Sequence, residues 1–557
     1  MALACSKARP CPTVLQEQVG NPYSRVCRCL VNGKKDWGLA EKFPAVGSRE
    51  NVTQVAPKAA TGKVATTGTT SMRHSVRVCV SGQDKIHLPD TLAEISSPSH
   101  IAITAKLLAR TMASLAVSTA LLFLLCLLSP TCSRAADSSG GNKPRAVKLP
   151  VRKDAATGQY VTTFRQRTPL VPVTAVLDLA SPTVWVDCEK GYASSTYRRV
   201  PCESKLCRLT GSGSCATSCD GKPGPSCLNN TCSGLPQNTA TSVATSGNIL
   251  TDVLALPTTT LTGPLATAPA FRFTCGATFL TKGLAAGATA MASLSRNRFA
   301  LPAQLANTFG FRRTRFKLCL PSTPTTTPSV GAVIGDAPHV FQPGVDLSGS
   351  LSYTPLLVNP VSGLTHFQGD KSDEYFVGVT GVKVNGRAVP LNATLLAVNK
   401  KTGTGGAKLS AAAPYTVLET SIYRAVTAAF AAATAGIPRA PAVAPFKLCY
   451  DGSKVRSTRV GPAVPTIELV LLGNSSKGAP SWVVFGANSM VRTKGGALCL
   501  GVVDGGKAPT TSVVIGGHML EDNLLEFDLD RSRLGFSSSL LFRQTNCNNF
   551  HISGSQL

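Results

Sequence analysis

The chain has few long runs of apolar residues, and it lacks the motifs of nucleic-acid recognition. Its only long apolar run spans residues 115–128, which is shorter than the ~20 residues that a membrane-spanning helix needs. The chain contains no basic helix, no paired zinc-ligand spacing and no aromatic RNA-binding motif. The formal net charge of +27 alone would permit a nucleic-acid partner, but without such motifs we expect none.

Glycine and proline do not form repeats or blocks in this chain. The 49 glycines and 37 prolines are scattered among turns rich in threonine and serine, which excludes collagen-like and coiled-coil proteins. Apolar residues make up 43% of the 557 residues and charged residues 15%. A chain of this length and composition buries a large core and forms two or three domains.

The apolar run at 115–128 has the length of a signal-peptide core. A methionine stands just before it and small residues follow it, so we predict a signal peptide over 112–136 and secretion to the extracellular space or cell wall. A transmembrane anchor is the alternative, which the length of the run and Pro130 at its end disfavour. Residues 1–111 are polar and without hydrophobic periodicity, and we expect a non-functional or disordered extension there.

The cysteines after the predicted cleavage point are even in number. A secreted chain with twelve of them is expected to form six disulfides. Zinc binding is the alternative, but no histidine lies in or near the densest cysteine cluster, and we expect neither a metal nor a cofactor. Three N-x-Ser/Thr triplets, at Asn229, Asn392 and Asn474, are predicted glycosylation sites. The twelve cysteines are Cys188, Cys202, Cys207, Cys215, Cys219, Cys227, Cys232, Cys275, Cys319, Cys449, Cys499 and Cys547.

Short β-type runs separated by Gly, Pro, Ser and Asn turns fill the chain from Val147 onward, and they predict an all-β protein. Helices are expected only at 421–435 and near 301–308. Two halves repeat the same order of features: a strand ending in a small-residue turn (175–181 and 407–413), then an apolar run ending in small residues (290–294 and 513–517). The repeat predicts two related lobes, at 137–350 and 351–557.

Two segments carry a family resemblance. VLDLASPTVW, at residues 176–185, resembles the first active-site strand of pepsin-like aspartic proteases, in which Asp-Thr/Ser-Gly precedes a tryptophan seven residues after the aspartate. The second segment resembles the closing strands of the second lobe in the same family. It begins with SVVIGGH at 512–518 and continues through the following strands to RLGF at 533–536. The resemblance covers about 400 residues, from Val147 to Cys547, and implies a bilobal pepsin-like fold.

The chemistry of that family needs two carboxylates about 3 Å apart that share one proton, one acting as base and the other as acid. Asp178 fills the first position, but Leu179 and Ala180 replace the hydroxyl residue and the glycine that follow it in the family. Aligning AKLSAAAPYTVL, at 407–418, with the second active-site strand places Ser410 where the second aspartate belongs. A serine hydroxyl is neither acid nor base at working pH, so we expect negligible proteolysis.

The flap of the family is also altered. Pepsin-like enzymes carry a tyrosine on a hairpin over the cleft, and this chain has no tyrosine between Tyr197 and Tyr353, although the hairpin is expected at about 239–256. The alternative is a misaligned second strand with a true aspartate elsewhere. Its nearest candidates are Asp370 and Asp373, which lack the small-residue turn that should follow.

The cysteine cluster, the strand at 407–418 and the ending LLFRQTNCNNF, at 540–550, resemble a narrower group: the plant TAXI-type xylanase inhibitors, extracellular dermal glycoproteins and basic 7S globulins. This resemblance implies disulfides Cys319–Cys547 and Cys449–Cys499. It also implies a secreted, monomeric protein without protease activity. The implied partners are microbial glycoside hydrolases, with acidic wall polysaccharide as a second partner.

The xylanase-blocking members use a histidine just before the last cysteine, and this chain has none there. Phe542, Arg543 and Gln544 occupy that stretch and form the predicted inhibitory loop, with Arg543 in the main role because a guanidinium bridges a carboxylate with two parallel hydrogen bonds. The simpler alternative is a solvated arginine near the end of the chain.

Two other functions stay open, an active aspartic endopeptidase and a basic storage or binding globulin. Two further features are expected to be structural. His518 is expected to be a packed or surface residue, and the basic run at 312–317 a solvated sheet edge.

Overall fold

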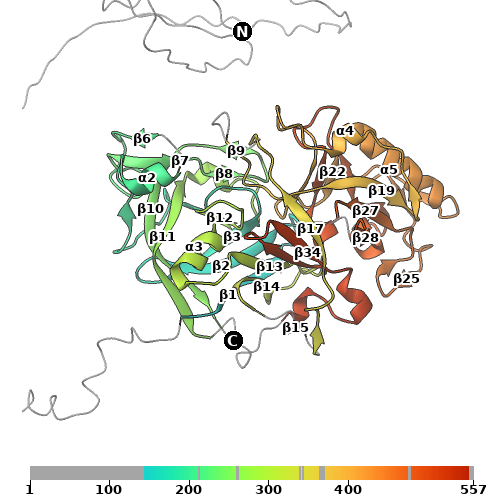
Figure 1. Cartoon of the computed structure of the whole chain (residues 1–557), viewed down its shortest axis with the longest axis horizontal. Helices are drawn as coiled ribbons and strands as arrows, with labels where there is room; N and C mark the ends of the chain where they lie inside the picture. Colours follow the sequence, from blue (N-terminus) through green and yellow to red (C-terminus); the bar gives the residue numbers. More distant parts are fainter. Residues whose placement is uncertain are drawn as a thin grey trace, which may run out of the picture. The chain divides into compact units, whose positions relative to one another are not determined.

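The structure is a computed structural model that describes residues 143–210, 214–258, 263–337, 340–341, 344–362, 370–473 and 478–550 (Figure 1). These residues all belong to one compact unit, which spans 123–557. The predicted extension, the predicted signal peptide and Asn474 lie outside the described residues. Within the described ranges, no helix combines the length and the apolar content that crossing a membrane requires.

Strands dominate both halves, as predicted. The first half contains β1 (Ala146–Lys153), β2 (Tyr160–Gln166), β3 (Val171–Asp178), β4 (Trp185–Asp187), β5 (Arg198–Arg199), β6 (Cys215–Ala216), β7 (Thr231–Gly234), β8 (Gln237–Asn238), β9 (Val243–Ala244), β10 (Gly247–Pro257), β11 (Leu265–Gly276), β12 (Ala290–Ser293), β13 (Arg315–Cys319), β14 (Ser329–Gly335), β15 (Val340–Phe341) and β16 (Val345–Asp346).

The second half contains β17 (Ser352–Leu357), β18 (Phe376–Val377), β19 (Val379–Val384), β20 (Arg387–Ala388), β21 (Ala407–Leu409), β22 (Thr416–Leu418), β23 (Arg439–Ala440), β24 (Cys449–Tyr450), β25 (Ser457–Thr458), β26 (Gly461–Pro462), β27 (Ile467–Leu471), β28 (Ser481–Val484), β29 (Met490–Arg492), β30 (Leu498–Leu500), β31 (Val502–Asp504), β32 (Val513–Ile515), β33 (Leu524–Asp528) and β34 (Arg533–Phe536). Alternating burial, as in β27, is the pattern of a strand with one face in the core.

The two longest helices lie where the sequence predicts them. α5 (Thr420–Ala433) begins at Glu419, whose carboxylate accepts hydrogen bonds from the backbone N–H groups of Ser421 and Ile422, and such a cap satisfies donors that the helix leaves unpaired. Its buried side follows helical spacing, with Ile422, Val426 and Phe430 facing the core. The other helices are α2 (Lys205–Thr210), α3 (Leu301–Phe309), α4 (Ala393–Leu396), α6 (Gly486–Ser489) and α7 (Gly517–Leu520).

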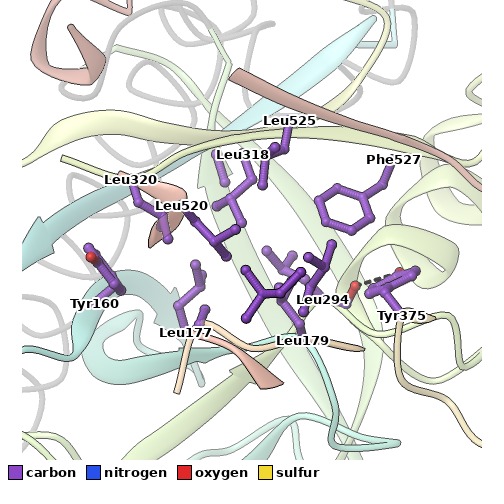
Figure 2. Close-up of a cluster of buried hydrophobic side chains, with 14 of the residues drawn as sticks. Tyr160, Leu177, Leu179, Leu294, Leu318, Leu320, Tyr375, Leu520, Leu525 and Phe527 are labelled. Carbon is purple, nitrogen blue, oxygen red and sulfur yellow. Dashed lines mark hydrogen bonds between the residues drawn. The ribbon is translucent and has the colours of Figure 1, made fainter. Parts of the chain in front are cut away.

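An antiparallel sheet in the order β1-β14-β13-β33-β34-β17 joins strands from the two halves. Its core side chains converge in Figure 2, where the ring of Phe527 lies close to that of Tyr375, at 4.6 Å between centroids. Phe527 also stacks on Phe316 of β13 at 4.4 Å. The C-terminal strands therefore complete the core of the first half.

The expectation of a solvated edge at 312–317 is wrong. β13 lies between β14 and β33, and Lys317 is 1% exposed, with its ammonium group on the carbonyl oxygen of Ala337. Arg315 forms an ion pair with Asp336 at 2.5 Å. The sequence of the run indicates an edge strand because its partner, β33, is far away in the sequence, and no nearby residue indicates that the two strands pair.

The described residues form six disulfides, as predicted, and these include the two that the resemblance implies. The pairs are Cys188–Cys275, Cys202–Cys215, Cys207–Cys232, Cys219–Cys227, Cys319–Cys547 and Cys449–Cys499. Three of them lie within the short stretch from Cys202 to Cys232, where few apolar residues are available for packing. Cys319–Cys547 spans 228 residues and fixes the end of the described chain to β13.

Candidate functional site

The first half of the site is the turn that follows β3. β3 pairs in parallel with β12, and the register sets Asp178 opposite Ser293. The carboxylate of Asp178 is 1% exposed. Its Oδ1 accepts a hydrogen bond from the backbone N–H of Ala180 at 3.1 Å, and its Oδ2 accepts one from Ser181 at 2.6 Å. The side chain thus closes its own turn.

The second half repeats this pairing pattern. β21 pairs in parallel with β32, and β22 pairs with both β31 and β32, as β3 does with β12 and β4 does with β11 and β12. Residue 410 follows β21 as residue 178 ends β3. Ser410 Oγ accepts a hydrogen bond from the backbone N–H of Ala413 at 3.0 Å, the same three-residue bridge that Asp178 makes. Ser410 and Asp178 therefore make the same local contact after corresponding strands.

Apolar side chains follow both of these residues. Leu179 and Ala411 are fully buried, and Figure 2 shows Leu179 beside Leu177 and Leu294 in the apolar cluster. Neither side chain has a hydroxyl group to orient the neighbouring polar residue. Next to each of these hydrogen-bonded turns, the following residue therefore contributes apolar packing, where the resemblance implies a hydroxyl group beside the first of them.

A short hairpin of β8 and β9 covers Asp178. Thr239, in its tip, donates a hydrogen bond from Oγ1 to Asp178 Oδ1 at 2.9 Å. The indole N–H of Trp185 donates to the carbonyl oxygen of Gln237 at 2.8 Å and ties the hairpin to β4. The predicted flap range of 239–256 is wrong, because β10, from Gly247 onward, is a long strand paired with β11. Sequence reasoning missed Thr239, since a threonine among threonines and alanines carries no distinctive signal.

Burial dominates the electrostatics of Asp178. It raises the pKa of the carboxyl, hydrogen bonds from Ser181, Thr239 and Ala180 lower it, and the charge of Glu374 raises it further. Glu374 is itself paired with Lys408 at 2.6 Å. A buried carboxyl with a raised pKa holds its proton at a higher pH than an exposed one.

The alternative aspartates do not complete a pair with Asp178. Asp373 Oδ2 accepts a hydrogen bond from Asn297 Nδ2 at 2.9 Å, and burial raises the pKa of Asp373. Asp370 is exposed and lines a cavity of about 430 Å³ that also contacts Pro182 and Thr183. Within the described part of the chain, the hydrogen bonds to the Asp178 carboxylate come from Ala180, Ser181 and Thr239, and none joins it to a second carboxyl group.

We expect Asp178→Asn to lower the free energy of unfolding by about 2 kcal/mol at acid pH, because the amide brings two N–H donors toward groups that already donate, whereas the protonated carboxyl brings only one. The loss should shrink as the pH rises. The folded-state pKa of Asp178 lies above the unfolded value, so its contribution to stability is complete below the unfolded pKa and is lost as the pH rises through the folded pKa. Urea denaturation of both proteins from about pH 3 to about pH 8 measures this trend; a loss that grows with pH would contradict it.

The predicted inhibitory loop lies on a 3₁₀ turn, η2 (Leu540–Arg543). Phe542 is 47% exposed, and its ring meets that of Phe485 edge-on at 4.6 Å. Arg543 is exposed and donates from Nη2 to Ser350 Oγ at 3.0 Å. Gln544 ends the turn with a φ of 55° in the left-handed region. These contacts hold an exposed arginine on an ordered turn.

The remaining predicted residues lie at separate places. His518 Nδ1 is 2.9 Å from Glu521 Oε2, and its Nε2 is 3.0 Å from the carbonyl oxygen of Met490, so it is packed as expected. Asn229 and Asn392 are exposed, and Asn392 caps α4 through a hydrogen bond from Thr394. Among the residues that the structure describes, no group of three or more His, Cys, Asp or Glu side chains is placed to hold a metal ion.

Comparisons with known proteins agree with this arrangement. Two family models match: "Xylanase inhibitor N-terminal" over residues 160–336 and "Xylanase inhibitor C-terminal" over 374–538. A probable aspartic proteinase, GIP2, of Nicotiana benthamiana is 48% identical over 435 residues, which are 77% of this chain and 97% of that protein. The basic 7S globulin of Glycine max is 36% identical, over 73% of this chain and 91% of that one.

Solved structures show the same likeness. The crystal structure of EDGP has a TM-score of 0.70 and 46% sequence identity, and it covers 74% of this chain and 100% of that chain. The basic 7S globulin from soybean has a TM-score of 0.62 and 34% identity, with the same coverage. The matches extend through both lobes and across the turns that hold Asp178 and Ser410, and this chain belongs to the xylanase-inhibitor family of pepsin-like, aspartic protease-like proteins.

Proposed function

We propose that the chain is a secreted protein without protease activity that inhibits microbial endoglycanases which degrade the plant cell wall, xylanases or xyloglucanases. The observation that carries the loss of proteolysis is the equivalence of Ser410 with Asp178, since both side chains accept a hydrogen bond from the residue three places on. One carboxylate cannot be base toward water and acid toward the peptide at the same time. The hydroxyl group of Thr239 on Asp178 Oδ1 also takes a position that the attacking water would need.

The family supports an inhibitory role, and Arg543 supplies chemistry that suits it. A glycosidase cleft holds two catalytic carboxylates. A guanidinium group inserted between them gains charge-assisted hydrogen bonds in a site that excludes water. The turn that carries Arg543 is already ordered through Phe542 and Ser350, so little conformational entropy is lost on binding. An excess of basic over acidic residues favours encounter with an acidic cleft.

Arg543→Ala tests this role. The purified chain is titrated against xylanases and xyloglucanases of the major families, and residual hydrolysis gives the inhibition constant. We expect the substitution to raise that constant at least ~30-fold for the inhibited enzyme, because the two cleft carboxylates lose their charged partner. Arg387→Ala, which removes an exposed arginine from β20, is the matched control and should leave inhibition unchanged. Equal inhibition by both variants would remove Arg543 as the inserted group.

Two other functions have support in the names of relatives. A probable aspartic proteinase among them favours an active endopeptidase, which would need a catalytic partner for Asp178 that the described residues do not supply. Relatives named globulins and conglutins favour a storage or binding protein. A pull-down from cell-wall extract that returns peptide or pectin without a glycosidase would support the binding protein over the inhibitor.

A further inference from the structure

Cations gather at one end of the small sheet β23-β24-β30-β29. The chain leaves β24 through a turn in which Asp451 donates its backbone N–H to Pro438 and Lys454 donates its own to Asp451. The guanidinium group of Arg492, at the end of β29, lies against Gly452, with Nη1 about 3.1 Å from where a Cβ would stand. Lys494 occupies the turn from β29 to β30, which closes through a hydrogen bond from Gly496 to Thr493.

Arg456 follows Lys454 and leads into the hairpin of β25 and β26. Its carbonyl oxygen accepts a hydrogen bond from Ala463, so the segment is ordered. We call the group Lys454, Arg456, Arg492 and Lys494 the basic end. Arg439 is nearby, but its guanidinium stacks on Tyr450 at 4.5 Å and donates to the carbonyl oxygen of Ala431, which gives it a structural role.

Neighbouring acids offset only part of the charge of the basic end. All four side chains are exposed, and no ion pair between described residues includes any of them. Asp451 is the acid within the turn. Its carboxylate accepts hydrogen bonds from the hydroxyl and N–H groups of Ser453 at 2.7 and 2.9 Å. These bonds and, to a smaller extent, the charge of Lys454 lower the pKa of Asp451, so this one carboxylate offsets part of the charge of Lys454. Some exposed cations elsewhere form ion pairs, such as Lys447 with Asp504 and Arg531 with Asp528. Four unpaired cations on one ordered surface attract a polyanion.

The surrounding surface indicates which polyanion fits. The segments that carry the basic end, residues 444–471 and 486–500, contain no exposed large apolar side chain. The basic end therefore offers no aromatic ring on which a nucleic-acid base could stack. It also offers no apolar group that could insert into a lipid surface. Six disulfides indicate an oxidising compartment outside the cytosol. Several relatives are plant proteins, and carboxylated polysaccharides are the polyanions of the plant wall.

We propose that the basic end is a docking surface for de-esterified polyuronate, the carboxylated polysaccharide of the cell wall. Binding there is independent of glycanase inhibition, because Arg543 lies on a different turn with contacts of its own. The surface would hold the protein in the wall while the inhibitory turn stays exposed. Methyl esterification of the polymer removes the charges that the cations contact, so affinity should follow the free carboxylate content.

The test uses the purified chain and polygalacturonate in a titration at several salt concentrations. The variant Lys454→Gln, Arg456→Gln, Arg492→Gln, Lys494→Gln removes four charges, and we expect it to weaken binding at least about ten-fold and to make affinity less dependent on salt. The control Lys190→Gln, Lys205→Gln, Lys222→Gln, Lys400→Gln removes four exposed charges elsewhere and should change affinity less than about two-fold.

Three results would overturn the proposal. Equal weakening in both variants would show that net charge alone drives binding. Equal affinity for fully methyl-esterified pectin would show that carboxylates are not recognised. Tighter binding to RNA or to anionic vesicles at equal charge concentration would assign the surface to another polyanion. The midpoint temperature of thermal unfolding is measured for each variant as a folding control. A midpoint equal to that of the wild type supports the assignment, because it shows that a loss of binding does not come from misfolding.

Discussion

The purified chain should cleave peptide substrates at acid pH at least ~10⁴-fold more slowly than an active pepsin-like proteinase in the same assay. The physical reason is the missing second carboxyl group. Asp178 Oδ1 already accepts hydrogen bonds from Ala180 and Thr239, and Oδ2 accepts one from Ser181. A nucleophilic water would have to displace Thr239 and would still find no acid to protonate the peptide.

Two controls make this measurement decisive. Asp178→Asn should leave the residual rate unchanged, because a lone carboxylate contributes nothing that the amide removes. A pepstatin-type inhibitor should have no effect for the same reason. Cleavage that is blocked by the inhibitor and abolished by Asp178→Asn would establish an active endopeptidase and would contradict the proposed loss of activity.

The local half of the site could be predicted from the sequence, since it depends on contacts between neighbouring residues. Asp178 and Ser181 are three residues apart, and Ser410 and Ala413 are separated in the same way. A strand followed by a small-residue turn is visible in one dimension, and the repeat of that pattern in the second half locates Ser410. The repeated features predict two lobes, and the motifs at 176–185 and 512–518 carry the resemblance to the family. The bilobal fold and the family are both confirmed.

The parts that could not be predicted depend on contacts between distant segments. Thr239 reaches Asp178 across 61 positions of sequence, and Arg543 reaches Ser350 across 193. β13 is a central strand only because β33 returns from the far end of the chain to pair with it. The pattern of hydrophobic residues indicates which face of a strand is buried, but it does not indicate which other strand pairs with it.

Disulfide connectivity illustrates the same limit. Twelve cysteines predict six bonds, but spacing alone does not say how seven cysteines between Cys188 and Cys232 are connected. In the structure Cys188 leaves this cluster and pairs with Cys275, at the end of β11, whereas the other six pair among themselves. The parallel pairing of β4 with β11 brings these two residues together, and that pairing is a property of the fold.

The largest effect on stability should come from the double substitution Cys319→Ala, Cys547→Ala. This disulfide closes a loop of 228 residues, and the chain-entropy model gives about 5 kcal/mol for a loop of that length. Both cysteines are fully buried beside Phe341, Leu524 and Phe550, so the lost sulfur contacts add to the cost. We expect a large fall in the urea midpoint, followed through the fluorescence of the buried Trp185 and Trp482.

Cys219→Ala, Cys227→Ala is the matched control, because that bond closes a loop of only 8 residues and the same model gives about 2.5 kcal/mol. Equal losses in the two variants would refute loop closure as the main source of the stabilisation.

The variants also separate stability from inhibition. Cys547 ends the segment that carries Arg543, so releasing it frees the turn and should weaken glycanase inhibition under conditions where both proteins are still folded, whereas the control should inhibit as the wild type does.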